Sequence, residues 1–187
     1  MIGVRRPYES EVNVILQPRP RESSSPQVIL GGGSALFLCF SFPVHLDRAA
    51  RVHGRWTRSL RQSSYSFDKN AWRCAYDSGE DGFQRFLDWC VGQSSTTAVL
   101  FDENPRQDFW VEYAIEASLE RDNRLLAIDL STGTDESPCG RTEALSSNPL
   151  ALFDLQDLVP TYHWDRDGGR SNITSWIEKA PRAHSIL

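Results

Sequence analysis

The amino-acid sequence predicts an α/β protein whose central, mainly parallel sheet is covered by helices on both faces. Three apolar runs of strand length, residues 35–42, 96–101 and 124–131, have the unbroken hydrophobic character of strands that are buried on both faces. Segments with the apolar spacing of amphipathic helices separate these runs. Because strands that alternate with helices pair in parallel through crossover connections, the order of elements favours this class.

The length of 187 residues suits one domain with a substantial core. Residues 1–33 are rich in proline, serine and glycine, which predicts a flexible N-terminal leader with at most a short strand at 12–16. The ordered domain is therefore expected to span residues 34–187.

The first half of the domain is expected to begin with the strand at 35–42 and a helix at 45–60. A short strand is predicted at 71–76, and a helix capped by Asp81 follows at 82–93. The run at 96–101 is the next buried strand.

The second half opens with a helix predicted over 105–122. Asn104 is a favourable N-cap residue for this helix, and Pro105 suits the first helical position because its missing N–H has no intrahelical partner there. After the strand at 124–131, the sequence predicts a long polar loop, an edge strand at 159–164 and a final helix at 172–180.

Charge and cysteine content exclude several classes of protein. The formal net charge of -5 argues against a nucleic-acid binder, although a small anionic ligand fits. The four cysteines form no CxxC pair, so no structural metal site is expected. The longest apolar stretch is far shorter than the roughly 20 residues of a membrane span, and no secretory leader is visible. These features predict a cytoplasmic protein without membrane contact.

The candidate ligand site lies at the carboxyl ends of the predicted strands, where open α/β sheets bind ligands. Phe40, Ser41, Phe42 and Asp47 lie at the end of the first predicted strand or just after it, and Trp110 lies on the helix that follows the strand at 96–101. They offer aromatic walls, a hydroxyl group and a carboxylate. The alternative interpretation is an ordinary strand end followed by a helix-capping acid.

Other groups of residues give weaker indications of chemistry. Ser41, His45 and Asp47 are too close in sequence to predict a catalytic triad, and the glycines at 31–33 precede a strand where a phosphate-binding loop would follow one. Asp102 follows an apolar strand, as a phosphoacceptor would, but a single acid has little specificity.

A metal site formed by His163, Asp165 and Asp167 is possible from composition, although a solvated loop is the favoured interpretation. No metal is therefore included among the expected ligands.

Residues 36–56, 96–131 and 173–180 together resemble the TIR-like domains of bacterial Thoeris anti-phage systems. The resemblance extends over about 34–180 and implies a flavodoxin-like, three-layer TIR fold. It also implies that NAD is a substrate, cleaved at the nicotinamide–ribose bond to make a cyclic or conjugated ADP-ribose signal for a partner effector protein. TIR self-association, with a site completed across a subunit contact, is a further implication.

Family members read Trp-Val-x-Trp-Glu-Ile on the helix in question, and the glutamate is catalytic. Here Trp110, Val111, Tyr113 and Ile115 match this pattern or nearly so, but Ala114 occupies the position of the glutamate. The chain is therefore either a naturally inactive TIR-like domain or, as the intact surrounding motif favours, a Glu→Ala variant. Residue 114 is expected to border a polar cleft.

Glu112 and Glu116 cannot simply replace the missing acid, because each points about 200° away from residue 114 around the helix. Both are expected to be solvated. Two other functions stay open: a TIR-like scaffold that only associates with other proteins, and a nucleoside deoxyribosyltransferase-like enzyme.

Overall fold

The computed structural model describes residues 36–59, 67–103, 108–131 and 148–186. The predicted leader with its short strand, and most of the polar loop before residue 148, lie outside these ranges. Within them the chain forms an α/β fold in which helices flank a four-stranded, all-parallel sheet. The predicted fold class is confirmed, and the arrangement is consistent with a flavodoxin-like TIR fold.

The sheet has the order β1-β2-β3-β4, and all three strand pairs are parallel. Its strands are β1 (Leu36–Cys39), β2 (Thr96–Phe101), β3 (Arg124–Asp129) and β4 (Thr161–His163). The three apolar runs are confirmed as buried strands, because nearly every residue of β1, β2 and β3 is excluded from solvent. The predicted edge strand is confirmed as β4.

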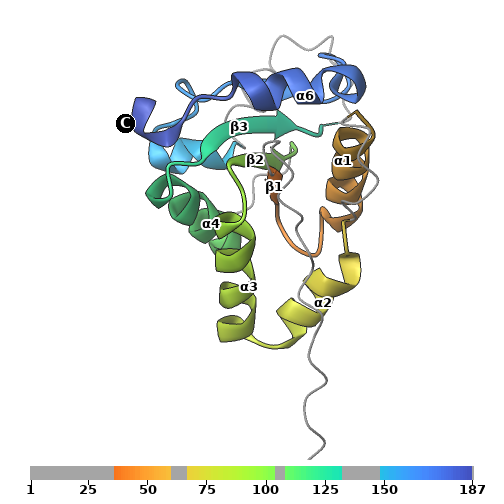
Figure 1. Ribbon diagram of the computed structural model, residues 1–187, viewed down its shortest axis with the longest axis vertical. Helices are drawn as coiled ribbons and strands as arrows, with labels where there is room; N and C mark the ends of the chain where they lie inside the picture. Colours follow the sequence, from red (N-terminus) through yellow and green to blue (C-terminus); the bar gives the residue numbers. More distant parts are fainter. Residues whose placement is uncertain (1–35, 60–66, 104–107, 132–147, 187) are drawn as a thin grey trace, which may run out of the picture.

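Helices cover both faces of this sheet (Figure 1). The first pair, α3 (Glu80–Gly92) and α4 (Phe109–Glu120), pack together on one face. The second pair, α1 (Leu46–Ser59) and α6 (Gly169–Lys179), pack together on the other. Two short 3₁₀ helices, η1 (Pro149–Phe153) and η2 (Ala183–Ser185), complete the described elements. No helix in these described ranges is long and apolar enough to cross a membrane.

The prediction of a strand at 71–76 is wrong, because this segment belongs to the helix α2 (Lys69–Asp77). The side chain of Asp68 caps the helix by accepting the backbone N–H groups of Asn70 and Ala71 at 2.9 and 3.2 Å. Trp72 is buried on one side of the helix. A short apolar run fits the period of a strand and of a helix almost equally well, and here the cap decides between them.

Three helix starts also differ from the sequence predictions. The N-cap of α3 is Gly79, so Asp81 lies inside the first turn, where its negative charge interacts favourably with the helix dipole. Asp108 caps α4, which therefore begins at Phe109, four residues after the predicted start. The last helix, α6, begins at Gly169, three residues before the predicted start at 172.

Aromatic side chains fill the space between β1, α2 and α3. Trp72 stands at the centre, with six rings at centroid distances of 4.6–6.2 Å. The six rings belong to Phe37, Phe40, Phe42, Phe67, Phe83 and Phe86. We call these six residues and Trp72 the Trp72 cluster. The cluster joins the end of β1 to the two helices that follow α1.

Replacing Trp72 by alanine is expected to lower the free energy of unfolding by about 3–5 kcal/mol, since it removes the common partner of the surrounding rings and leaves a cavity. Chemical denaturation monitored by circular dichroism measures the change. Tyr76→Ala, on the same helix but 43% exposed, should cost clearly less. Equal losses for the two variants would contradict a central role for Trp72.

Candidate functional site

The carboxyl ends of β1 and β2 meet at one edge of the sheet. Their parallel register pairs Cys39, the last residue of β1, with Val99, and β2 continues to Phe101. The chain that leaves each strand, residues 40–45 after β1 and Asp102 after β2, therefore emerges at the same edge. In open α/β sheets this edge is where ligands bind.

Ser41 connects this edge to the start of α4. Its hydroxyl donates to Asp108 Oδ2 at 2.6 Å, and Asp108 Oδ1 accepts the backbone N–H of Trp110 at 3.0 Å. The structure thus brings Ser41 close to the first turn of the helix that carries Trp110. The N-terminus of α4 already has its own carboxylate as a cap.

The predicted aromatic residues divide into two groups. Phe42 and Trp110 are half-buried, and both contact the ring of Phe83, at centroid distances of 5.8 and 5.1 Å. Phe40 is 4% exposed and packs 4.6 Å from Trp72, so it is part of the core. Of the three, Phe42 and Trp110 keep surface that a ligand could contact.

Asp47 is not joined to the other predicted site residues by any described contact. Its carboxylate is exposed and lies 2.6 Å from Lys69 Nζ on α2. The hydrogen bond and charge of Lys69 lower the pKa of the Asp47 carboxyl group. Asp47 therefore acts here as one half of a surface ion pair between α1 and α2.

A group that the sequence did not single out lies at the same edge and consists of His45, Arg48 and Asp102. His45 Nε2 is 3.0 Å from Asp102 Oδ2, and Arg48 Nη1 donates to the same oxygen at 2.9 Å. His45 and Asp102 are buried, whereas the Arg48 side chain is 32% exposed. The available signal was an acid directly after an all-apolar strand, but its partners lie more than 50 residues away in sequence.

Ala114 lies on the face of α4 that packs against β2. It is 1% exposed, and its carbonyl accepts the hydroxyl of Ser118 at 2.7 Å. Ser118 Oγ is also 2.8 Å from Thr97 Oγ1 of β2. Residues 114 and 118 therefore share one face of α4, whereas Glu116, expected to be solvated, is exposed. Ala114 is buried, so its side chain does not border an open cleft in this structure, contrary to the expectation from the sequence.

Cys39, the last residue of β1, places a thiol near this edge, and this thiol is not suited to act as a nucleophile. Burial, with a smaller contribution from the Asp108 carboxylate, raises the pKa of the Cys39 thiol well above its ordinary range. Its Sγ atom donates to the carbonyl of Val111 at 3.6 Å. The thiolate needed for covalent chemistry is therefore strongly disfavoured.

His163 and Asp167 form a backbone turn. Asp167 Oδ2 accepts the N–H of His163 at 2.7 Å, and His163 Nδ1 accepts the N–H of Arg166 at 3.1 Å. Across the described residues, no three His, Cys, Asp or Glu side chains gather in a way that could hold a metal ion.

Comparison with known proteins gives one informative similarity. The chain is 25% identical over 143 residues to "Putative cyclic ADP-D-ribose synthase ThsB1" of Bacillus cereus (strain MSX-D12). The matched region covers 75% of this chain and 70% of that protein. No protein-family model matches the chain. The similarity supports a relationship to ThsB-like proteins of Thoeris defence.

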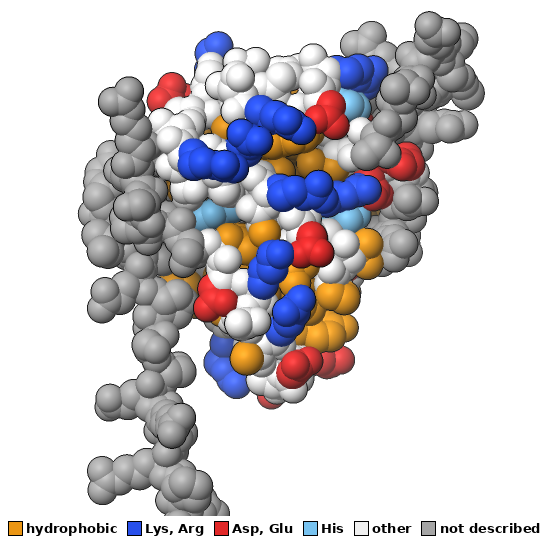
Figure 2. All heavy atoms as spheres, turned by 90° about the vertical axis from the view of Figure 1, so that its right-hand side faces the viewer, with side chains coloured by type: hydrophobic (Ala, Val, Ile, Leu, Met, Phe, Trp, Pro, Cys, Tyr) orange, Lys and Arg blue, Asp and Glu red, His pale blue; other side chains and the backbone are white. Residues whose placement is uncertain are grey.

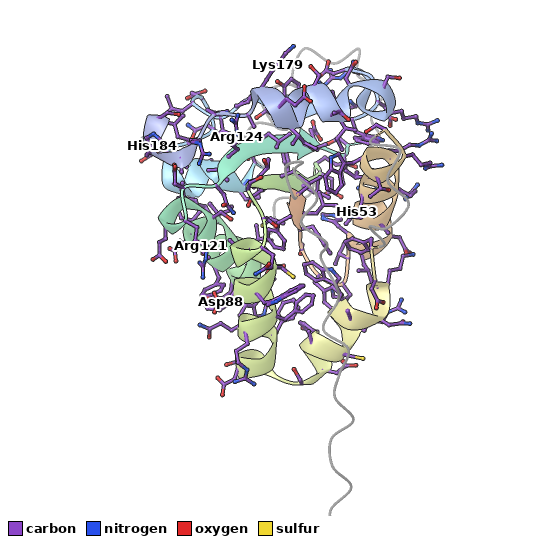
Figure 3. All side chains as sticks on the ribbon, viewed as in Figure 1. His53, Asp88, Arg121, Arg124, Lys179 and His184 are labelled. Carbon is purple, nitrogen blue, oxygen red and sulfur yellow. The ribbon has the colours of Figure 1, made fainter. Side chains whose placement is uncertain are left out.

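His53, which is labelled in Figure 3, belongs to α1 and contacts Phe67 of the Trp72 cluster. Its ring is 5.3 Å from Trp56 and 5.6 Å from Phe67. Burial among these rings lowers the pKa of His53 to about 4. The neutral imidazole is therefore the form that the folded protein accommodates.

This shift predicts a pH-dependent stability. In the unfolded chain, His53 takes up a proton below about pH 6.5, whereas in the folded chain it does so only near pH 4. The free energy of unfolding therefore falls as the pH drops from about 6.5 to about 4. The loss from His53 is at most about 3 kcal/mol at pH 4. Chemical denaturation at several pH values measures it, and His53→Phe should have a shallower dependence. Identical pH profiles for the two proteins would contradict the assignment.

Proposed function

We propose that this chain is a TIR-like domain that binds NAD or a related ADP-ribose ligand at the carboxyl edge of its sheet. The similarity to a protein named as a cyclic ADP-D-ribose synthase, spanning three-quarters of the chain, is the observation that carries the proposal. The edge supplies suitable chemistry, since half-buried Phe42 and Trp110 can contact a base and Ser41 offers a hydroxyl group. NAD is the substrate in this proposal, and no separate cofactor is invoked.

The reaction proposed for an active form of this domain is cleavage of the nicotinamide–ribose bond. Breaking this bond develops positive charge on the ribose, which a neighbouring carboxylate stabilises in the transition state. Ala114 supplies neither a charge nor a hydrogen-bond acceptor at the position where the family carries its glutamate. The chain as written should therefore bind the dinucleotide and turn it over poorly.

In an active form, the released ADP-ribose unit would be cyclised or joined to another group and would then activate an effector protein. Self-association of the domain belongs to the same proposal, because TIR sites are often completed across a subunit contact. The product, the effector and the assembly are tested separately from ligand binding.

A second candidate function, that of a non-catalytic scaffold, is favoured by one observation. Ala114 is 1% exposed, so a glutamate at this position would have to enter a buried site. A nucleoside deoxyribosyltransferase-like activity is the third candidate. Incubation with deoxynucleosides, with base exchange followed by chromatography, tests it directly.

Ala114→Glu is expected to increase nicotinamide release from NAD by about 100-fold or more, since it restores the anion beside the developing ribose cation. Nicotinamide would be quantified by chromatography at high protein concentration, because assembly can limit activity. The matched control is Ala117→Glu, which places the same side chain at another buried alanine of α4. It should release no more nicotinamide than the unchanged chain.

The outcome separates the two candidate functions. If Ala114→Glu folds, binds NAD and still releases no more nicotinamide than the unchanged chain, the enzyme proposal fails and the scaffold takes its place. If Ala114→Glu fails to fold, ADP-ribose binding to the unchanged chain, measured by calorimetry, still tests the binding part of the proposal.

Phe42→Leu is expected to weaken ADP-ribose binding by about 10-fold, because aromatic stacking on a base contributes on the order of 1–3 kcal/mol. Isothermal titration calorimetry measures the affinity. Phe86→Leu is the control, since Phe86 belongs to the same cluster but comes from α3. Equal affinities for the two variants would remove Phe42 from the ligand site.

A further inference from the structure

Arg48 is held at the carboxyl edge by a buried acid. Its guanidinium group donates to Asp102 Oδ2, and His45 Nε2 approaches the same oxygen. The side chains of His45 and Asp102 are 5% and 7% exposed, so water competes little for these contacts. The guanidinium group is consequently fixed in orientation, while 32% of the Arg48 side chain stays accessible.

Among the residues that the structure describes, this guanidinium group makes fewer hydrogen bonds than it has N–H donors. An arginine carries five N–H donors in a planar fork that matches phosphate oxygens. Within the described residues, Asp102 is the one partner recorded for the Arg48 side chain, through Nη1. Donors of a fixed guanidinium that reach the surface suit a bidentate contact with an anion.

The imidazole of His45 adds a second feature to this group of side chains. His45 Nδ1 is buried and has no hydrogen-bond partner within the described part of the chain. Buried polar atoms of this kind are uncommon in folded proteins, because an unmade hydrogen bond costs on the order of 1–3 kcal/mol. When Nε2 donates to Asp102, Nδ1 is an acceptor, so an ordered water molecule could satisfy it whereas phosphate oxygens could not. An anion contact at this group therefore comes from Arg48.

The other helix start at this edge is closed to an anion. The Asp108 carboxylate occupies the N-terminus of α4, where it accepts the N–H of Trp110 and the hydroxyl of Ser41. A phosphate placed there would meet this negative charge. At the beginning of α1, Arg48 offers a partly exposed guanidinium group, next to Asp47, whose carboxylate is paired with Lys69.

We propose that Arg48 binds the pyrophosphate of the ADP-ribose unit, and that Asp102 and His45 position its guanidinium group. This inference rests on the proposed function, which it deepens by assigning the part of the ligand that α1 recognises. The simpler alternative is that the three residues only attach α1 to β2. The two possibilities predict different effects of an Arg48 substitution. If the contact is purely structural, the substitution weakens the binding of ligands with and without phosphate equally.

The experiment compares Arg48→Gln with the unchanged chain by isothermal titration calorimetry, using ADP-ribose, inorganic pyrophosphate and adenosine. Loss of a charge-assisted phosphate contact is expected to weaken ADP-ribose binding by about 10- to 100-fold. Pyrophosphate binding should be lost, and adenosine binding should be unchanged. Equal weakening for adenosine and ADP-ribose would show a structural role and overturn the inference.

The matched control is Arg51→Gln, one turn further along α1. Arg51 is exposed, and its Nε donates to the backbone carbonyl of Asp47. Figure 2 shows that several Lys and Arg side chains lie on one face of the molecule, so general electrostatic attraction needs a control. The change in net charge is the same as in Arg48→Gln. If Arg51→Gln weakens ADP-ribose binding as much as Arg48→Gln, general electrostatic attraction explains the effect and the assignment to Arg48 is wrong.

Asp102→Asn tests the positioning role through a double-mutant cycle. It should weaken ADP-ribose binding about 10-fold in the unchanged chain and have little further effect in the Arg48→Gln background, since its influence passes through Arg48. Independent, additive effects would remove the positioning role.

Failure of this inference can be told apart from failure of the proposed function. If ADP-ribose binds the unchanged chain and Arg48→Gln equally, the function stands and the phosphate contact is elsewhere. If ADP-ribose does not bind the unchanged chain, the proposed function fails. In that case, pyrophosphate binding that is lost in Arg48→Gln would still show an anion site at Arg48. If pyrophosphate does not bind the unchanged chain either, the anion site is overturned as well.

Discussion

The candidate site depends on one constraint, which is that β1 and β2 pair in parallel inside a sheet buried on both faces. Side chains along such strands pack into the core, so polar side chains can contact a ligand only where the strands end. Parallel pairing places both ends at the same edge. Asp102 after β2 can therefore contact the first turn of α1, which follows β1, although more than 50 residues separate them in sequence.

The Trp72 cluster has a related role at the side of the sheet. Within the described structure β1 is an edge strand, and an uncovered edge strand is prone to pair with other chains. Trp72 of α2 stacks on Phe37 of β1 and contacts Phe40 just beyond the strand. The helix that replaces the expected strand at 71–76 thus packs beside β1 through its side chains instead of extending the sheet by hydrogen bonds.

Sequence patterns predicted the elements that have one dominant signal. The apolar runs of β1, β2 and β3 have the length of buried strands and lie between helical segments, and α1 shows a clear amphipathic period. Helix starts were less predictable, because Asn104 and Asp108 are both good caps and only tertiary contacts, such as that of Ser41, favour Asp108. The pairing of His45 and Arg48 with Asp102 could not be inferred, since it requires the strand order.

The groups proposed for ligand binding and the position proposed for bond cleavage make different contacts, although Trp110 and Ala114 are both on α4. Ser41 is held by Asp108, and Arg48 is held by Asp102, whereas Ala114 contacts Ser118 on the face of α4 that meets β2. No described hydrogen bond links the first two pairs to Ala114. A change between glutamate and alanine at residue 114 can therefore remove or restore chemistry without rebuilding the groups proposed to hold the nucleotide. For this reason an inactive natural domain and a Glu→Ala variant of an active one would share the same binding edge.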